Sequence, residues 1–131
     1  MALLAPTLAH IEQLAQTAAE RLPELFRQHL SNVILRVTDF PDEEVMDMME
    51  LESPFDILGL YQGHAVGSPG HDMTGAMPPT IYLYRRPLLD AWSEGDDTLE
   101  ALVTHVLVHE VGHHFGLSDA DIEAIEASAA E

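Results

Sequence analysis

Two histidines four residues apart, His109 and His113, stand near the end of an apolar segment with helical spacing. The apolar positions of that segment are Leu99, Leu102, Val103, Val106 and Leu107. Residues at positions i and i+4 project from the same face of a helix, with their Cβ atoms about 6 Å apart. Gly116 is well placed to end the helix in the left-handed conformation. The sequence therefore predicts a long helix with two imidazoles on one face and a sharp turn after it.

Short polar signals predict where this helix and the next one begin. Asp97, with Glu100 three residues later, has the arrangement of a capping box at the start of the long helix. Ser118 with Asp121 repeats that arrangement at the start of a last helix, over residues 119–131, which turns Ile122 and Ile125 inward.

The segment HEVGH, residues 109–113, has the His-Glu-x-x-His pattern of zinc peptidases. Two imidazoles at this spacing can share a cation, and Glu110 can reach the solvent side of the ion without binding it. In such sites the metal lowers the pKa of a bound water, and the glutamate accepts its proton. We expect His109 and His113 to be metal ligands and Glu110 to be the catalytic base. The donor types suit zinc but also other divalent ions.

A catalytic zinc usually has three protein ligands and an open fourth position, so a further donor is needed. A turn at Gly116 folds the chain back beneath the metal, where it can deliver Asp119. In the alternative interpretation, Asp119 sits in the first turn of the last helix and interacts with the helix dipole. We favour the ligand, because a site of two histidines would lack a donor.

His105 and His114 flank the same segment. Histidines 105, 109 and 113 form a row, but successive steps drift round the helix and span about 12 Å, too far for one tetrahedral ion. His105 is therefore expected to be a half-buried histidine or to line the cleft. His114 points about 100° away from His113, which indicates a surface or packing role.

Composition narrows the classes of function. At 131 residues the chain fits one domain, 1–131, with one core. The chain has 23 acidic and five basic residues, which give a formal charge of −18, so nucleic acid is not an expected partner. The sequence has no cysteine, which excludes thiolate chemistry and Cys-ligated metal. The N-terminus lacks the basic region of a signal peptide, and no apolar run reaches about 20 residues, so we expect a cytoplasmic protein with no membrane contact.

Six other segments and one loop have recognisable patterns. Apolar spacing predicts helices over 8–22, 24–30 and 41–51, and β-rich composition predicts strands over 32–40, 55–63 and 80–88. A Gly- and Pro-rich loop, residues 63–79, holds His64 and His71. Loops of this length are often binding loops or lids. The methionines 46, 48 and 49 are expected to fill gaps in the core or a loop.

The chain resembles a family of small bacterial zincin-like metallopeptidases. The matching segments are residues 22–37, 57–63, 80–89 and 106–123, the last containing His-Glu-x-x-His-x-x-Gly-x-x-Asp. The resemblance implies an α+β zincin-like fold, with a small twisted sheet of about three strands against the first helix and the active-site helix. It also implies Zn²⁺ held by His109, His113 and Asp119, with Glu110 as the base.

The leading hypothesis is a zinc metallopeptidase whose peptide or protein substrate pairs with an exposed strand edge, either ILGLYQG (57–63) or TIYLYRR (80–86). A metal-binding interaction module of the same fold with little hydrolytic activity is an alternative. A metal-dependent endoribonuclease is a weaker one, because those enzymes typically lack the glutamate after the first histidine and the acidic charge disfavours RNA.

Overall fold

The computed structural model describes residues 4–28, 30–63 and 78–129. Within these ranges the side chains of residues 25, 119, 125, 126, 128 and 129 lie outside the description. The predicted loop histidines, His64 and His71, and the side chain of Asp119 therefore fall outside the described residues. In the described part of the chain, no helix is both long and apolar enough to cross a membrane.

Two helices at the N-terminal end confirm the predicted pattern. Helix α1, Leu8–Glu20, begins where the Thr7 hydroxyl accepts a hydrogen bond from the His10 N–H at 3.1 Å. Its spacing of apolar residues buries Ile11, Ala15 and Ala18. Pro23 separates it from the short helix α2, Glu24–Arg27.

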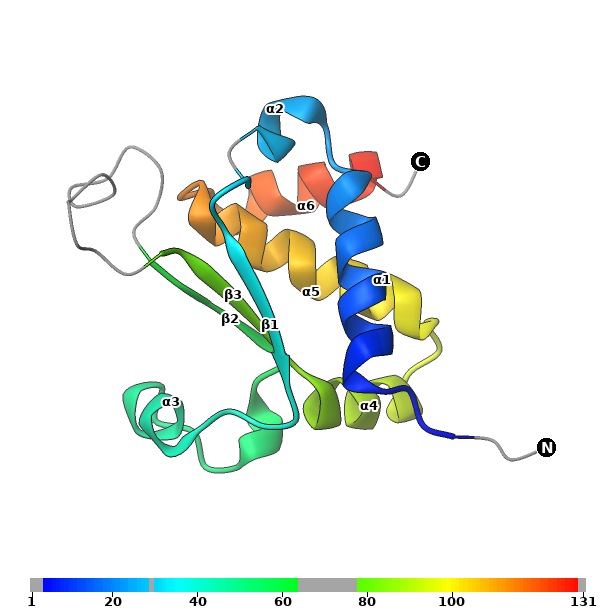
Figure 1. Cartoon of the computed structure of the whole chain (residues 1–131), viewed down its shortest axis with the longest axis vertical. Coiled ribbons are helices and arrows are strands. Elements are labelled where there is room, and N and C mark those ends of the chain that lie inside the picture. Colours follow the sequence, from blue (N-terminus) through cyan, green and yellow to red (C-terminus); the bar gives the residue numbers. More distant parts are fainter. Residues whose placement is uncertain (1–3, 29, 64–77, 130–131) are drawn as a thin grey trace.

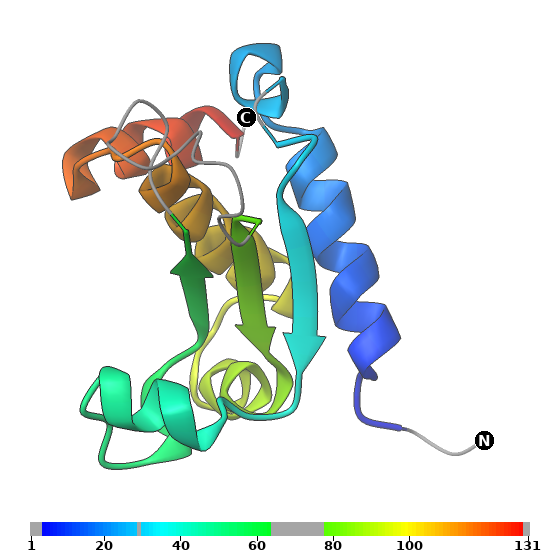
Figure 2. The same ribbon diagram turned by 60° about the vertical axis from the view of Figure 1, so that its left-hand side comes forward.

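Three strands form a mixed sheet in the order β1-β3-β2 (Figure 2). Strand β1, Ile34–Thr38, runs parallel to β3, Thr80–Tyr84, and β2, Gly59–Gln62, runs antiparallel to it. Because β3 is paired on both sides, the expectation that a peptide could pair with TIYLYRR was wrong. Among the described residues β2 pairs with β3 alone, so β2 is an edge strand.

Strands β2 and β3 are shorter than the predicted strands 55–63 and 80–88. Pro54–Asp56 forms the 3₁₀ turn η1, because the Ser53 and Asp56 side chains bond each other's backbone in a capping box. Only the last part of residues 55–63 is therefore a strand. The predicted strand 80–88 ends at Tyr84, because helix α4, Arg85–Glu94, begins directly after it. Pro87 lies in the first turn of α4, where proline is tolerated.

Helix α5, Leu99–His114, is the centre of the fold and contacts α1, α4, α6, β2 and β3 (Figure 1). Its N-cap is Thr98, whose hydroxyl accepts the Ala101 N–H at 3.0 Å, so the assignment of Asp97 as the cap was wrong by one residue. Glu100 is instead paired with Arg21 of α1 at 3.2 Å. That tertiary contact cannot be read from the local pattern.

The end of α5 follows the expected turn. Gly116 has a φ of 68°, and the N–H groups of Gly116 and Leu117 donate to the carbonyls of His113 and Gly112 in a Schellman motif. Helix α6, Asp119–Ala129, then begins, and the Ser118 hydroxyl accepts the Asp121 N–H as predicted.

Helices α1 and α5 cover one face of the sheet, and α3 packs on the other. The core contains Ile81 and Leu83 of β3 together with α1 and α5. Helix α3, Glu43–Met48, is capped by Asp42 and packs Val45 with Leu60 and Tyr84 on the opposite face. Met48 and Met49 are 56% and 44% exposed, so of the two expected roles, filling the core or packing in a loop, the first is excluded for them.

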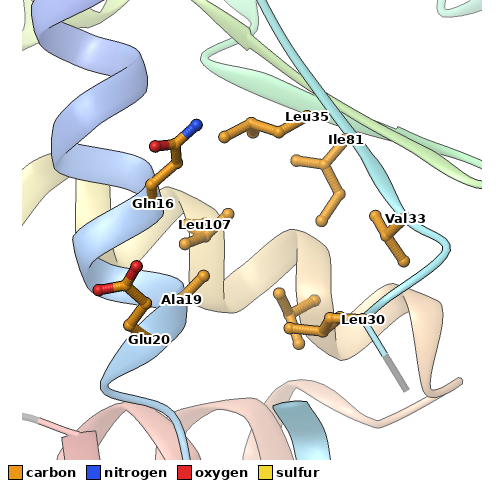
Figure 3. A pocket seen from close by; sticks show the side chains of 9 residues that line it. Gln16, Ala19, Glu20, Leu30, Val33, Leu35, Ile81 and Leu107 are labelled. Atoms are coloured by element: carbon orange, nitrogen blue, oxygen red, sulfur yellow. The ribbon is translucent and has the colours of Figure 1, made fainter. Parts of the chain in front are cut away.

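A largely apolar cavity of about 430 Å³ lies between α1, β1 and α5 (Figure 3). Leu107 and Val111 of α5 line it, with Gln16 and Glu20 of α1 on one wall. Leu107 and Val111 stand two residues on either side of His109, which places them about 200° round the helix from it. The cavity therefore lies behind the histidine-bearing face of α5.

Candidate metal centre

The two predicted histidine ligands come together on α5. The ring centroids of His109 and His113 are 5.0 Å apart and the rings are inclined at 78°. His109 is half-buried and His113 is exposed, so an ion between them would be open to solvent on one side. No three His, Asp or Glu side chains among those described form a group that could hold a metal. A third protein donor is thus expected from Asp119, whose side chain is not described.

Glu110 lies beside this pair but is buried, with 8% of its surface exposed. Burial raises the pKa of its carboxyl group, while the charge of His109 and a hydrogen bond from the Tyr61 backbone lower it in part. Desolvation is the largest of these effects and disfavours the ionised form. A carboxyl group with a raised pKa next to two imidazoles is typical of a general base.

The burial of Glu110 predicts a pH dependence of stability in the metal-free protein. A carboxyl group whose folded-state pKa is raised stabilises the fold only while protonated, and this contribution is lost as the pH rises above about 4.5 through the folded-state value. We expect Glu110→Gln to raise the free energy of unfolding at pH 7, and the gain to vanish below about pH 4.5. Urea unfolding of the metal-free wild type and of metal-free Glu110→Gln at several pH values measures this gain. A gain that is independent of pH would contradict the prediction.

Helix α6 brings the backbone of Asp119 back toward α5 through a close helix contact. Asp119 is the first residue of α6, so both predicted roles, ligand and helix-dipole partner, are compatible with its place in the chain. The contact depends on Gly112, because a Cβ atom there would lie 2.2 Å from Cγ1 of the buried Ile122. Gly112, inside the His-Glu-x-x-His segment, therefore sets the position of α6 relative to the histidines.

We expect Gly112→Ala to destabilise the protein by about 1–3 kcal/mol through overpacking. The overlap outweighs the gain of up to about 1 kcal/mol that alanine brings inside a helix. If Asp119 is a ligand, zinc affinity falls as well. Thermal unfolding and chelator competition measure both effects.

The matched control adds Gly112→Ala to Ile122→Ala, which removes the two nearest overlapping atoms. On that background Gly112→Ala should cost less than in the wild type, because contacting residues are not additive. Equal costs on the two backgrounds would contradict the proposed overlap.

A cleft runs over the histidine-bearing face of α5 along β2. It has two adjoining parts, of about 480 Å³ and 250 Å³, which share Ile57, Gly59, His109 and Glu110. Strand β2 and helix α5 can approach closely because Gly59 has no side chain. A Cβ atom at this position would lie 2.7 Å from Cγ1 of Val106. The exposed Met49 also lines the cleft, a position that sequence reasoning missed because its contact with β2 is tertiary.

Sequence alone left open the positions of the other two histidines of α5, His105 and His114. His105 is exposed and lines the cleft, with its ring 6.4 Å from that of His109, so cleft lining is confirmed and half-burial was wrong. His114 is fully buried, and its Nδ1 lies 2.8 Å from the Tyr61 hydroxyl. Packing is therefore confirmed for His114 and a surface position is excluded. The contact between Tyr61 and His114 joins residues 53 positions apart, so the sequence holds no local signal of it.

The donors fit a zinc ion. Neutral imidazole nitrogens from His109 and His113 are typical zinc ligands, and the exposed side of the pair leaves room for a further donor and an open position. The fully buried His114 belongs to the contact between β2 and α5 rather than to the face that carries His109 and His113.

Comparison with known proteins agrees with the fold. The sequence model of the family described as zincin-like metallopeptidase matches residues 30–129. A search of curated proteins gave no match. The match covers the sheet, α5 and α6, so the chain belongs to the zincin-like metallopeptidase family.

Proposed function

We propose that the protein is a zinc-dependent metallopeptidase that hydrolyses peptide bonds in extended substrates, with Glu110 as the general base. The observation that carries this proposal is the burial of Glu110 beside His109 and under the edge strand β2, within a cleft. A structural metal site has no use for a buried base with a raised pKa, whereas hydrolysis does.

Zinc held by His109, His113 and Asp119 would supply Lewis acidity, which activates water and polarises a carbonyl group. Glu110 would accept the proton of the attacking water and pass it to the leaving amine. The Tyr61 backbone holds this carboxylate by a hydrogen bond, so the base is fixed relative to β2.

The edge of β2 supports an extended peptide as the substrate. A peptide that adds a strand there would form main-chain hydrogen bonds and lie over the cleft and Glu110. Strand β2 is tied to α5 at Gly59 and at Tyr61, which would hold the added strand at a constant height above the base.

The test is cleavage of a random peptide library by the zinc-loaded protein. We expect cleavage that is lost on chelation and restored by adding Zn²⁺. Peptides with N-methyl groups on alternate backbone nitrogens should be cleaved less when the methylated groups are those that pair with β2. Zinc binding without any cleavage would contradict the proposal and favour the metal-binding interaction module.

A further inference from the structure

One buried histidine of α5, His114, has no role in the proposed mechanism. It is fully buried, and its Nδ1 lies 2.8 Å from the hydroxyl of Tyr61 in β2. The two rings also meet edge to face, with their centroids 5.4 Å apart. Burying an imidazole costs free energy unless its polar atoms are hydrogen-bonded, and in the described part of the chain no buried side-chain nitrogen or oxygen lacks a partner. The Tyr61 hydroxyl is therefore part of what allows His114 to be buried.

Strand β2 lies along one row of side chains on α5. Val106, Glu110 and His114 follow one another at steps of four residues, so neighbours in the row share a face of the helix. At the first of them, a Cβ atom on Gly59 would lie 2.7 Å from Cγ1. Tyr61 contacts the other two, since its backbone donates a hydrogen bond to the Glu110 carboxyl group and its hydroxyl pairs with Nδ1 of His114. One residue of β2 thus connects the proposed base with a fully buried residue one turn further along α5.

The side chain of Tyr61 is held at both ends. Its backbone is paired with β3 in the sheet, and its hydroxyl is paired with α5. Gly63 leaves the room for that hydroxyl, because a Cβ atom there would lie 2.7 Å from it. Burial raises the pKa of Tyr61, so the hydroxyl stays protonated at neutral pH and can donate to an unprotonated Nδ1. A rigid aromatic side chain bonded in this way prevents β2 from sliding along α5.

We propose that His114 is a positioning residue, which holds Tyr61 so that the backbone of Tyr61 keeps the Glu110 carboxyl group in place for proton transfer. The inference rests on the proposed function, because that function makes Glu110 the base. His114 is fully buried and lines neither part of the cleft, so it acts only through the residues that it contacts. A displacement of about 1 Å at a catalytic group can cost about 100-fold in rate. Loss of the bond between His114 and Tyr61 should therefore lower kcat more than it changes KM.

The first test is Tyr61→Phe, which removes only the hydroxyl. We expect kcat for a cleaved library peptide to fall about 10-fold or more, while KM changes by less than about threefold. In the Glu110→Gln background the same replacement should have almost no further effect, because residues that act as a unit are not additive. Tyr82→Phe, on the neighbouring strand and on the sheet face that carries α3, is the matched control and should keep full activity. An unchanged kcat, or equal fold losses with and without Glu110, would overturn the inference.

A second variant separates positioning from stability. Tyr61→Phe takes a hydrogen-bond partner from the buried His114 and is expected to lower the melting temperature. Combining it with His114→Leu removes both polar groups and should restore most of the stability. The double variant should nevertheless keep the low kcat, since no hydrogen bond then fixes β2 on α5. Recovery of kcat together with the melting temperature would mean that the pair has a structural role only.

Hydrogen exchange in the metal-free protein gives a readout that needs no activity. The amide of residue 61, the donor to Glu110, should exchange at least about 10-fold faster in Tyr61→Phe than in the wild type, because β2 opens locally. The amide of Ile34, which bonds to the Pro79 carbonyl at the other edge of the sheet, should change less. Equal acceleration of both amides would overturn the inference even in an active protein. If the wild type cleaves no peptide, the proposed function fails, and the exchange rates alone decide whether His114 fixes β2.

Discussion

Replacing His113 by alanine is expected to lower the affinity for zinc by more than about 100-fold, since loss of outer-shell partners alone costs 10–100-fold. His113 is exposed, so its removal leaves no internal cavity and the fold should be kept. The loss would therefore report the metal and not unfolding. Competition with a chromogenic chelator measures the affinity, and circular dichroism checks the fold.

His105→Ala is the matched control for this prediction. His105 is exposed on the same helix and its ring lies 6.4 Å from that of His109, so the change in residue type and surroundings is similar. We expect its zinc affinity to stay near that of the wild type. His114→Ala is not a suitable control, because it would remove a buried ring that contacts Tyr61. Equal losses in His113→Ala and His105→Ala would refute the assignment of His113.

The helices were predictable from the sequence because their signals are local. Apolar spacing over a few turns located α1, and the Gly116 turn and the Ser118 cap located the junction between α5 and α6. Such signals act between residues that are near each other in the chain, so no knowledge of the tertiary structure is needed. The N-cap of α5 was missed by one residue because Asp97 and Thr98 are adjacent and both are favoured N-cap residues. Glu100, the expected partner in the capping box, bonds instead to Arg21, which is 79 residues away.

The order of the strands could not be predicted in the same way. Strand β3 follows β2 in the sequence, and nothing in the composition of the two segments says which of them lies at the edge. The position of β3 in the centre depends on its parallel pairing with β1, across more than 40 residues. The structure therefore reduces the two predicted edges for peptide binding to β2.

In the candidate site, too, local features were predictable and tertiary contacts were not. His109, Glu110 and His113 were predictable because helical geometry places them by spacing alone. Burial raises the pKa of Glu110, and a hydrogen bond from the Tyr61 backbone lowers it in part. Both depend on the tertiary structure, and no local pattern reveals them. Asp119 as the third ligand remains a prediction from the sequence and the resemblance.

Burial of Glu110 links stability to the proposed chemistry. Burial excludes water from the carboxylate, which costs stability in the metal-free protein but places the proposed base beside His109. Residues that serve catalysis are often destabilising where they stand, so removing their charge stabilises the fold. Replacing Glu110 is therefore expected to raise the stability of the metal-free protein and to lower its catalytic activity.

Glu110→Gln is expected to lower kcat for peptide cleavage by about 10²–10⁴-fold, the usual contribution of a general base, while zinc is still bound. Glutamine has the same shape and can keep the hydrogen bond from the Tyr61 backbone, but it cannot accept the proton of water. Initial rates on a cleaved library peptide, with zinc content measured on the same samples, provide the test. Glu100→Gln, an exposed glutamate of the same helix, is the control and should keep full activity. Turnover by Glu110→Gln at the wild-type rate would rule out Glu110 as the base, even if the variant is the more stable protein.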